Sequence, residues 1–120
     1  MSPRHPARWR ASTRQKARFE ARLARAADPR LGEASFNVGR LAEALGMSVR
    51  TLQLRMQKLD LPTPVVWLLN HRLAHARLLL DEQAFETVAE VARAVGLSPS
   101  YFSRAFTAHT GTPPSELLRC

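Results

Sequence analysis

The chain has 120 residues, 45% of them hydrophobic and 23% charged, with 18 Lys and Arg against 10 Asp and Glu. This size supports one small core, and the few glycines, the many alanines and leucines and the absence of alternating strand patterns predict an all-α fold. No apolar run reaches membrane-spanning length, the N-terminus is too polar for a secretory signal, and a single cysteine, Cys120, excludes an internal disulfide framework, which together indicate a cytoplasmic protein.

Most of the positive charge lies near the N-terminus. Residues 1–30 hold nine Lys and Arg against two acidic residues, which gives +7, whereas residues 31–120 hold nine against eight, which gives +1. Basic charge of this kind attracts polyanions without reading their sequence. Any nucleic-acid affinity of the later residues must therefore come from local placement of their arginines.

The basic segment divides into two parts. Residues 1–12 contain prolines and scattered arginines without periodicity, which predicts a disordered basic leader. Residues 13–28 predict a helix with Phe19 and Leu23 on its apolar face, and the Asp-Pro pair at the end of this range stops it.

One sequence pattern occurs twice, at an offset of 50 residues. Residues 38–56 read VGRLAEALGMSVRTLQLRM and residues 88–106 read VAEVARAVGLSPSYFSRAF. Each copy has an apolar-periodic helix, a glycine, a serine and a second apolar-periodic helix, which is the sequence form of a helix-turn-helix. We expect the first unit to span residues 38–60 and the second to span residues 86–110.

Matched residues explain the turn of each unit. Gly46 and Gly96 follow the first helix, where the chain needs a positive φ that costs other residues energy. Ser48 and Ser98 then predict the cap of the second helix, and Pro99 suits its first position because the missing N–H would be unpaired there.

A single long helix is predicted between the units, over residues 63–82. Thr63 is its expected cap, Pro64 its first residue, and no glycine or proline interrupts it. Trp67 is expected in the core beneath it. The residues expected to dock the helix against both units are Val66, Leu69, Leu73, Ala76 and Leu80. A stiff helix would hold the two units at a set distance and angle. A final short helix is predicted over residues 113–119.

The segment from residue 36 to residue 119 resembles the DNA-binding domain of the AraC/XylS family of bacterial transcription regulators. The resemblance rests on RLAHARLLL from Arg72, on the second copy of the repeat, and on GTPPSEL from Gly111. It implies about seven helices, arranged as two helix-turn-helix subdomains joined by the linker helix. It also implies that two recognition helices occupy successive major-groove segments of double-stranded DNA.

The same resemblance implies the partners. RNA polymerase is the expected protein partner, and the chain also looks like the output domain of hybrid two-component regulators, so a sensor or receiver domain is missing if it is a fragment. Dimerisation in this family usually comes from that other domain, so we expect a monomer in isolation.

The family's groove-facing positions fall on both second helices of the repeat. The residues implied in base readout are Arg50, Thr51, Gln53, Leu54, Ser100, Tyr101, Ser103 and Arg104. Arginine can donate two hydrogen bonds to guanine and glutamine can pair similarly with adenine. The expected phosphate contacts are Ser48, Arg55, Lys58, Arg72, Arg77, Ser98 and Thr107.

Three positions depart from the family pattern. Leu54 stands where an arginine is common, so the first unit is expected to contact a thymine methyl group there. Leu61 replaces the usual glycine after the first recognition helix, and Pro113 replaces the usual serine of the closing turn.

The sequence is also compatible with functions other than sequence-specific DNA binding. A nonspecific or architectural nucleic-acid binder would depend on the basic N-terminus, and a helical protein-interaction module would use the same two units for docking. His71 and His75 lie four residues apart, but nothing nearby completes a metal site, so a structural or surface role is expected. No nucleophile-base pair, carboxylate dyad or phosphate loop occurs, so neither an enzyme nor a bound cofactor is predicted.

Overall fold

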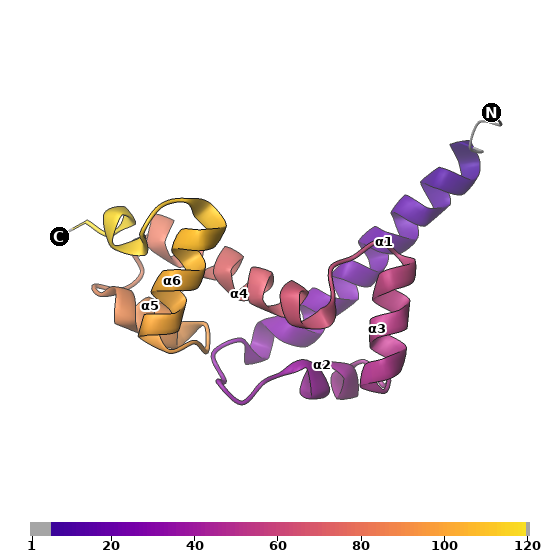
Figure 1. The fold of residues 1–120 in the computed structure, drawn as a ribbon, viewed down its shortest axis with the longest axis horizontal. Helices are drawn as coiled ribbons and strands as arrows, with labels where there is room; N and C mark the ends of the chain where they lie inside the picture. The colour runs from indigo at the N-terminus through magenta and orange to yellow at the C-terminus, as the bar shows by residue number, and fades with distance from the viewer. Residues whose placement is uncertain (1–5, 120) are drawn as a thin grey trace.

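The computed structural model describes residues 6–119 (Figure 1). Within this range the chain is all helical and contains no strand, which confirms the expected fold class. Its α-helices are α1 Pro6–Ala27, α2 Val38–Ala44, α3 Val49–Lys58, α4 Pro64–Asp81, α5 Val88–Ala94 and α6 Pro99–Thr110, and its 3-10 helices are η1 Asp28–Arg30 and η2 Pro114–Leu117. None of the helices in the described range is long and apolar enough to cross a membrane.

The first helix begins earlier than expected. A disordered leader was predicted over residues 1–12, but α1 starts at Pro6 and continues without a break to Ala27. Proline suits the first turn of a helix, and the alanines and arginines that follow have high helix propensity, so the helix extends past its apolar face. Residues 1–5 of the expected leader lie outside the described residues.

The apolar face of α1 is where the sequence predicts it. Phe19, Leu23 and Ala27 follow one another at intervals of four residues, and all three are buried in the core. The helix ends at Ala27, and Asp28 and Pro29 continue the chain in the 3-10 conformation. The expected stop signal is therefore confirmed.

Both turns of the repeat have the predicted geometry. Gly46 and Gly96 adopt φ values of +72° and +77°. Ser48 and Ser98 cap α3 and α6, and each serine Oγ accepts a hydrogen bond from the backbone N–H three residues later, at 3.1 and 3.4 Å. The two units are α2–α3 and α5–α6.

The turn after α3 works without the family's usual glycine. Asp60 adopts the left-handed conformation, with φ of +60°, and Leu61 is buried in the first core. An aspartate tolerates this conformation better than a β-branched or bulky residue does. The left-handed position has therefore moved to Asp60, which leaves Leu61 free to pack.

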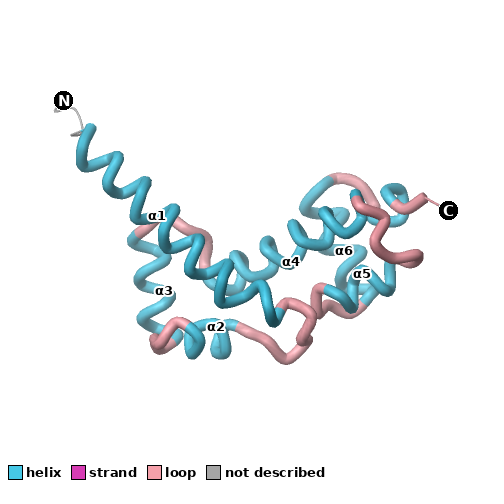
Figure 2. The backbone as a smooth tube through the Cα atoms, turned by 180° about the vertical axis from the view of Figure 1, so that it is seen from behind, coloured by secondary structure: helices cyan, strands magenta, loops and turns pink. Residues whose placement is uncertain are grey.

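The linker helix α4 contributes to two separate hydrophobic cores. The first core lies among α1, α2, α3 and the start of α4, and the second lies among α4, α5, α6 and the C-terminal segment. Its side chains in the first core are Trp67 and Leu68, and those in the second are Leu73, Ala76 and Leu80. The tube trace in Figure 2 shows α4 running between the two groups of helices. The expected core position of Trp67 is confirmed.

The apolar row of α4 is shifted at its N-terminal end. Val66 was expected in the core, but its side chain is 45% exposed, and Leu69 is only partly buried. Trp67 and Leu68 fill the first core instead. A helix that serves two cores at different angles need not keep one straight apolar row along its length, because each half turns a different face inward.

A close approach joins the two units. The loop between η1 and α2 passes the turn between α5 and α6, and a Cβ atom added to Gly96 would lie 2.5 Å from the carbonyl oxygen of Leu31. A Cβ on Gly32 would lie 3.2 Å from the carbonyl oxygen of Ala94. Glycine at both positions therefore lets the backbones touch. Gly46, in the matching turn of the first unit, has nothing within 4 Å of such a Cβ.

This difference gives a matched pair of substitutions. Gly46→Ala should cost only the strain of a positive φ, about 1–2 kcal/mol of unfolding free energy. Gly96→Ala should cost a further 1–3 kcal/mol or so, because the new methyl group overlaps a backbone carbonyl that cannot move freely. Urea unfolding of both variants measures the difference. Equal losses would mean that the contact between loop and turn relaxes without cost.

Candidate nucleic-acid interface

The two candidate recognition helices lie at opposite ends of the linker helix. Figure 1 shows α3 beyond one end of α4 and α6 near the other, with both helices running in a similar direction from the lower edge of the view. Helix α4 packs against both of them. The linker therefore sets the distance and angle between two exposed helices, as its length and stiffness predict.

Helix α3 turns one face inward and leaves the other open. Leu52 and Met56 are fully buried, so the opposite side of the helix faces solvent. The four base-readout residues predicted on this helix are all exposed: Arg50, Thr51, Gln53 and Leu54. The structure thus brings them together on one accessible helix.

Helix α6 repeats this arrangement. Phe102 and Phe106 are fully buried and their ring centroids lie 5.4 Å apart. Of the four predicted readout residues, Ser100, Tyr101 and Arg104 are exposed and Ser103 is partly buried. The open face of α6 carries a single charge, that of Arg104.

Tyr101 lies at the junction between the units. It lines a shallow groove of about 260 Å³ together with Val38 at the start of α2 and with Val65 and Leu69 of α4. Its side chain is 43% exposed. Tyr101 therefore occupies the inner flank of α6, next to the first unit, and the other predicted residues of α6 are absent from this groove.

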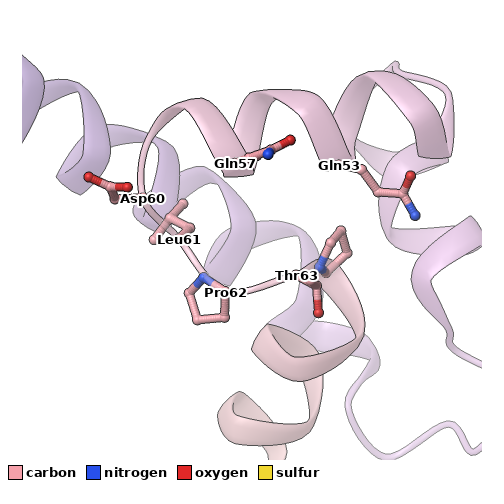
Figure 3. Close-up of a pocket in the computed structure, with 7 residues that line it drawn as sticks. Gln53, Gln57, Asp60, Leu61, Pro62 and Thr63 are labelled. Carbon is pink, nitrogen blue, oxygen red and sulfur yellow. The ribbon is translucent and has the colours of Figure 1, made fainter.

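The two flanks of α3 have different surroundings. Gln53 and Gln57 line an open cavity of about 670 Å³ with the segment from Asp60 to Pro64, which leads into α4. Figure 3 shows both glutamines along α3 beside this segment. On the other flank, Arg55 lies over the ring of Phe19 of α1, with its Cζ 5.6 Å from the ring centroid. One flank of α3 therefore faces α4 and the other faces α1.

Most of the predicted phosphate contacts lie at the surface. Ser48, Ser98, Arg55 and Lys58 are all exposed. The serine oxygens already accept the helix N–H groups, and the Ser48 hydroxyl also donates to Thr51 Oγ1 at 3.0 Å. The N-terminal amides of α3 and α6 lie beside these serines, in positions that can bind an anion.

Two other predicted phosphate contacts have partners within their own helices. Arg77 Nε donates to Asp81 Oδ1 at 3.2 Å, and the pair is exposed. Thr107 Oγ1 donates to the carbonyl oxygen of Ser103 at 2.7 Å and is partly buried. Both side chains would have to give up these hydrogen bonds, or share them, to contact DNA.

Arg72 does not lie where a phosphate contact requires. Its side chain is buried, with 7% exposed, and its Nη2 donates to the carbonyl oxygens of Glu33 at 2.9 Å and Phe36 at 3.1 Å. Its Nε and Nη2 also approach the carbonyl oxygen of Leu31 at 3.4 Å. Burial lowers the pKa of the guanidinium from its ordinary value. The expected phosphate contact of Arg72 is therefore wrong, because this side chain is a buried clamp on the loop that precedes α2.

The sequence carried a signal for this placement. Arg72 lies four residues after Leu68 and four before Ala76, and both of these residues are buried. An arginine in the buried row of a helix must find hydrogen-bond acceptors in the interior, and backbone carbonyls of an irregular loop can supply them.

The histidine pair of α4 is not arranged around a common point. His71 Nε2 lies 2.6 Å from Asp28 Oδ1, and its ring stacks on Trp67 with centroids 4.6 Å apart. His75 is exposed. Among the side chains that the structure describes, no cluster of three or more His, Cys, Asp or Glu residues is placed to hold a metal ion.

Comparison with known proteins agrees with this architecture. A family model described as a helix-turn-helix domain, of the AraC type, matches residues 41–119. The matched range begins within α2 and includes α3, α4, α5, α6 and η2. A comparison with curated proteins found no significant match.

The clamp role of Arg72 predicts a loss of stability. Arg72→Met keeps much of the apolar stem but leaves buried carbonyl oxygens without a donor, which should cost about 2–4 kcal/mol of unfolding free energy. Arg77→Met removes an exposed arginine of the same helix and should change stability by less than about 0.5 kcal/mol. Chemical unfolding compares the two. An Arg72→Met protein as stable as the Arg77→Met protein would contradict the clamp.

Proposed function

The chain belongs to the AraC/XylS family of helix-turn-helix DNA-binding proteins, and from that premise we propose that it reads one asymmetric, two-part site with both of its recognition helices. Family membership supports DNA binding in transcription regulation, and the matched domain is a DNA-binding regulatory domain. The proposal adds the number of reading helices, the residues that read bases and the form of the site.

One observation carries the proposal: two helices with open outer faces are held at opposite ends of one rigid helix. Because α4 belongs to both hydrophobic cores, neither unit can turn without disturbing a core. Two reading helices at a fixed separation favour successive major-groove segments about one helical turn, ~10 bp, apart on the same face of DNA.

The chemistry of the open faces supports asymmetric readout. In the proposal, Arg50 of α3 and Arg104 of α6 each donate hydrogen bonds to a guanine, and Gln53 pairs with an adenine. Leu54 is 48% exposed and contacts a thymine methyl group. The remaining readout residues, Thr51, Ser100, Tyr101 and Ser103, contribute less selective contacts from their hydroxyl groups. The two helices therefore read different sequences, so the site has no twofold symmetry.

Phosphate contacts fix the register of each helix on the duplex. Arg55 and Lys58 are exposed along α3 and are candidates for direct contact with the backbone. Ser48 and Ser98 mark the N-termini of α3 and α6, where free amide groups attract phosphate oxygens. Arg72 acts through position alone, since it holds the loop between the units and does not reach the surface.

The partners follow from this mode of action. Transcription regulation by DNA binding acts through RNA polymerase, so polymerase is the protein partner in the proposal. Because one chain already carries two reading helices, it binds its site as a monomer. If the chain is a piece of a longer regulator, a sensor or receiver domain of that regulator would supply the signal.

Selection from a random double-stranded DNA pool at physiological salt tests the proposal. The native chain should enrich a motif of two unlike elements with centres ~10 bp apart. Arg50→Ala and Arg104→Ala should each weaken binding by about 1–3 kcal/mol and relax base preference in a different element, because each removes the donor for one base.

A matched control separates readout from general charge. Arg93 of α5 is exposed and lies outside both reading helices, so Arg93→Ala should retain the full motif. The proposal fails if the native chain enriches no motif. The assignment of Arg50 and Arg104 to bases fails if their variants weaken matched and random DNA equally.

A further inference from the structure

Helix α1 carries a row of arginines that the proposed readout does not use. Arg14, Arg18, Arg22 and Arg25 follow one another at intervals of four, four and three residues, which places them on one side of a helix. All four are exposed. At 1.5 Å per residue the row is about 16 Å long. We call these four residues the arginine ridge.

The positive charge of the ridge continues onto the flank of α3 that faces α1. The guanidinium carbons of Arg22 and Arg55 lie 5.5 and 5.6 Å from the centroid of the same Phe19 ring. Both cations are therefore held beside one buried aromatic side chain. Lys58 lies one turn beyond Arg55 on α3, so positive charge runs from α1 to the flank of a reading helix.

The charge of the ridge is not neutralised within the described part of the chain. The ion pairs in residues 13–119 join Arg30 to Glu33, Arg77 to Asp81 and His71 to Asp28. None of them involves the ridge, Arg55 or Lys58. Like charges at intervals of four residues repel one another, so a partner with closely spaced negative charges would stabilise the ridge.

The charge is also confined to one end of the molecule. Residues 13–60 hold ten Lys and Arg against five Asp and Glu, which gives +5, whereas residues 61–119 hold five of each and are neutral. In Figures 1 and 2, only the N-terminal part of α1 extends beyond α3 on the side away from α6, and the helix then runs past α3 toward the second unit. The chain after α1 leads to Leu31 and Gly32, which lie against the second unit, so the C-terminal end of the ridge points toward that unit.

We propose that the arginine ridge binds the phosphates of the double-stranded DNA that carries the first half-site. This inference rests on the proposed function, because the first half-site defines which DNA lies beside α1 and α3. The continuity with Arg55 and Lys58 favours the backbone of the DNA that α3 already reads. A membrane surface fits poorly, because the apolar residues Phe19 and Leu23 of α1 are buried in the core.

The test removes two ridge charges that do not lie beside the Phe19 ring. Arg18→Gln combined with Arg25→Gln keeps helix propensity and leaves Arg22 on Phe19. The control, Arg93→Gln combined with Arg119→Gln, removes two exposed and unpaired arginines of the neutral half. A third protein with Arg18→Lys and Arg25→Lys retains the charge. Far-ultraviolet circular dichroism confirms that each variant is folded.

Affinity is measured for the selected site and for a random duplex of equal length, from 50 to 200 mM salt. Each lost phosphate contact makes the negative slope of log affinity against log salt shallower by about 0.9. The slope of the ridge variant should therefore be smaller in magnitude than the native slope by about 1.8. The ratio of the native affinity to the affinity of the ridge variant should therefore fall about 12-fold between 50 and 200 mM salt. The control should keep the native slope, and the lysine protein should have nearly the native slope.

The inference is overturned if the ridge variant has the same salt slope as the control, because the ridge would then bind no phosphate of the duplex and an acidic protein would be its partner instead. If the native chain prefers no site, the proposed function fails, and a lower slope on the random duplex still identifies the ridge as a phosphate-binding surface.

Discussion

The hydrogen bonds from Arg72 to the loop before α2 are the interaction on which the arrangement of the molecule depends. This guanidinium projects from the middle of α4, between the two cores, and donates to carbonyl oxygens of Glu33 and Phe36. The same loop presses against the turn at Gly96 of the second unit, where a side chain would not fit. One loop is therefore fixed to the linker helix and to the second unit at once. A buried charge that satisfies several carbonyls is costly to displace, so the angle between the units is well defined.

The two units have the same helix-turn-helix fold but differ in their positive charge. The first combines an open reading face with unpaired arginines and Lys58, while the second presents Arg104 among hydroxyl groups and belongs to a neutral half. Electrostatic attraction is long-ranged and insensitive to sequence, whereas hydrogen bonds to bases require contact. In our account the first unit supplies most of the affinity. In the same account the second unit adds discrimination between DNA sequences, because α6 can contact bases only when the rigid linker places it in the correct groove.

Local features of the fold followed from the sequence, whereas long-range contacts did not. The turns at Gly46 and Gly96 are set by a few neighbouring residues, so a repeated glycine and serine sufficed to predict them. The place of Arg72 in the buried row of α4 indicates burial, but its acceptors are backbone carbonyls about forty residues away, so the local pattern does not reveal what the guanidinium binds. Val66 was misplaced because the two cores lie at different angles around α4. The positions of the candidate readout residues on open helix faces could be predicted, since helical periodicity alone separates them from the buried residues.

The central claim is that two reading helices are held at one fixed separation. It is tested most directly by measuring affinity for the selected site while base pairs are inserted between its two elements. With a rigid linker, an insertion of about 5 bp or of about 10 bp should lower affinity to that of a single element, because the second helix reaches neither the opposite face nor the next turn. Recovery of affinity at about 10 bp, where the element returns to the same face, would show that the units are flexibly joined and would contradict the account.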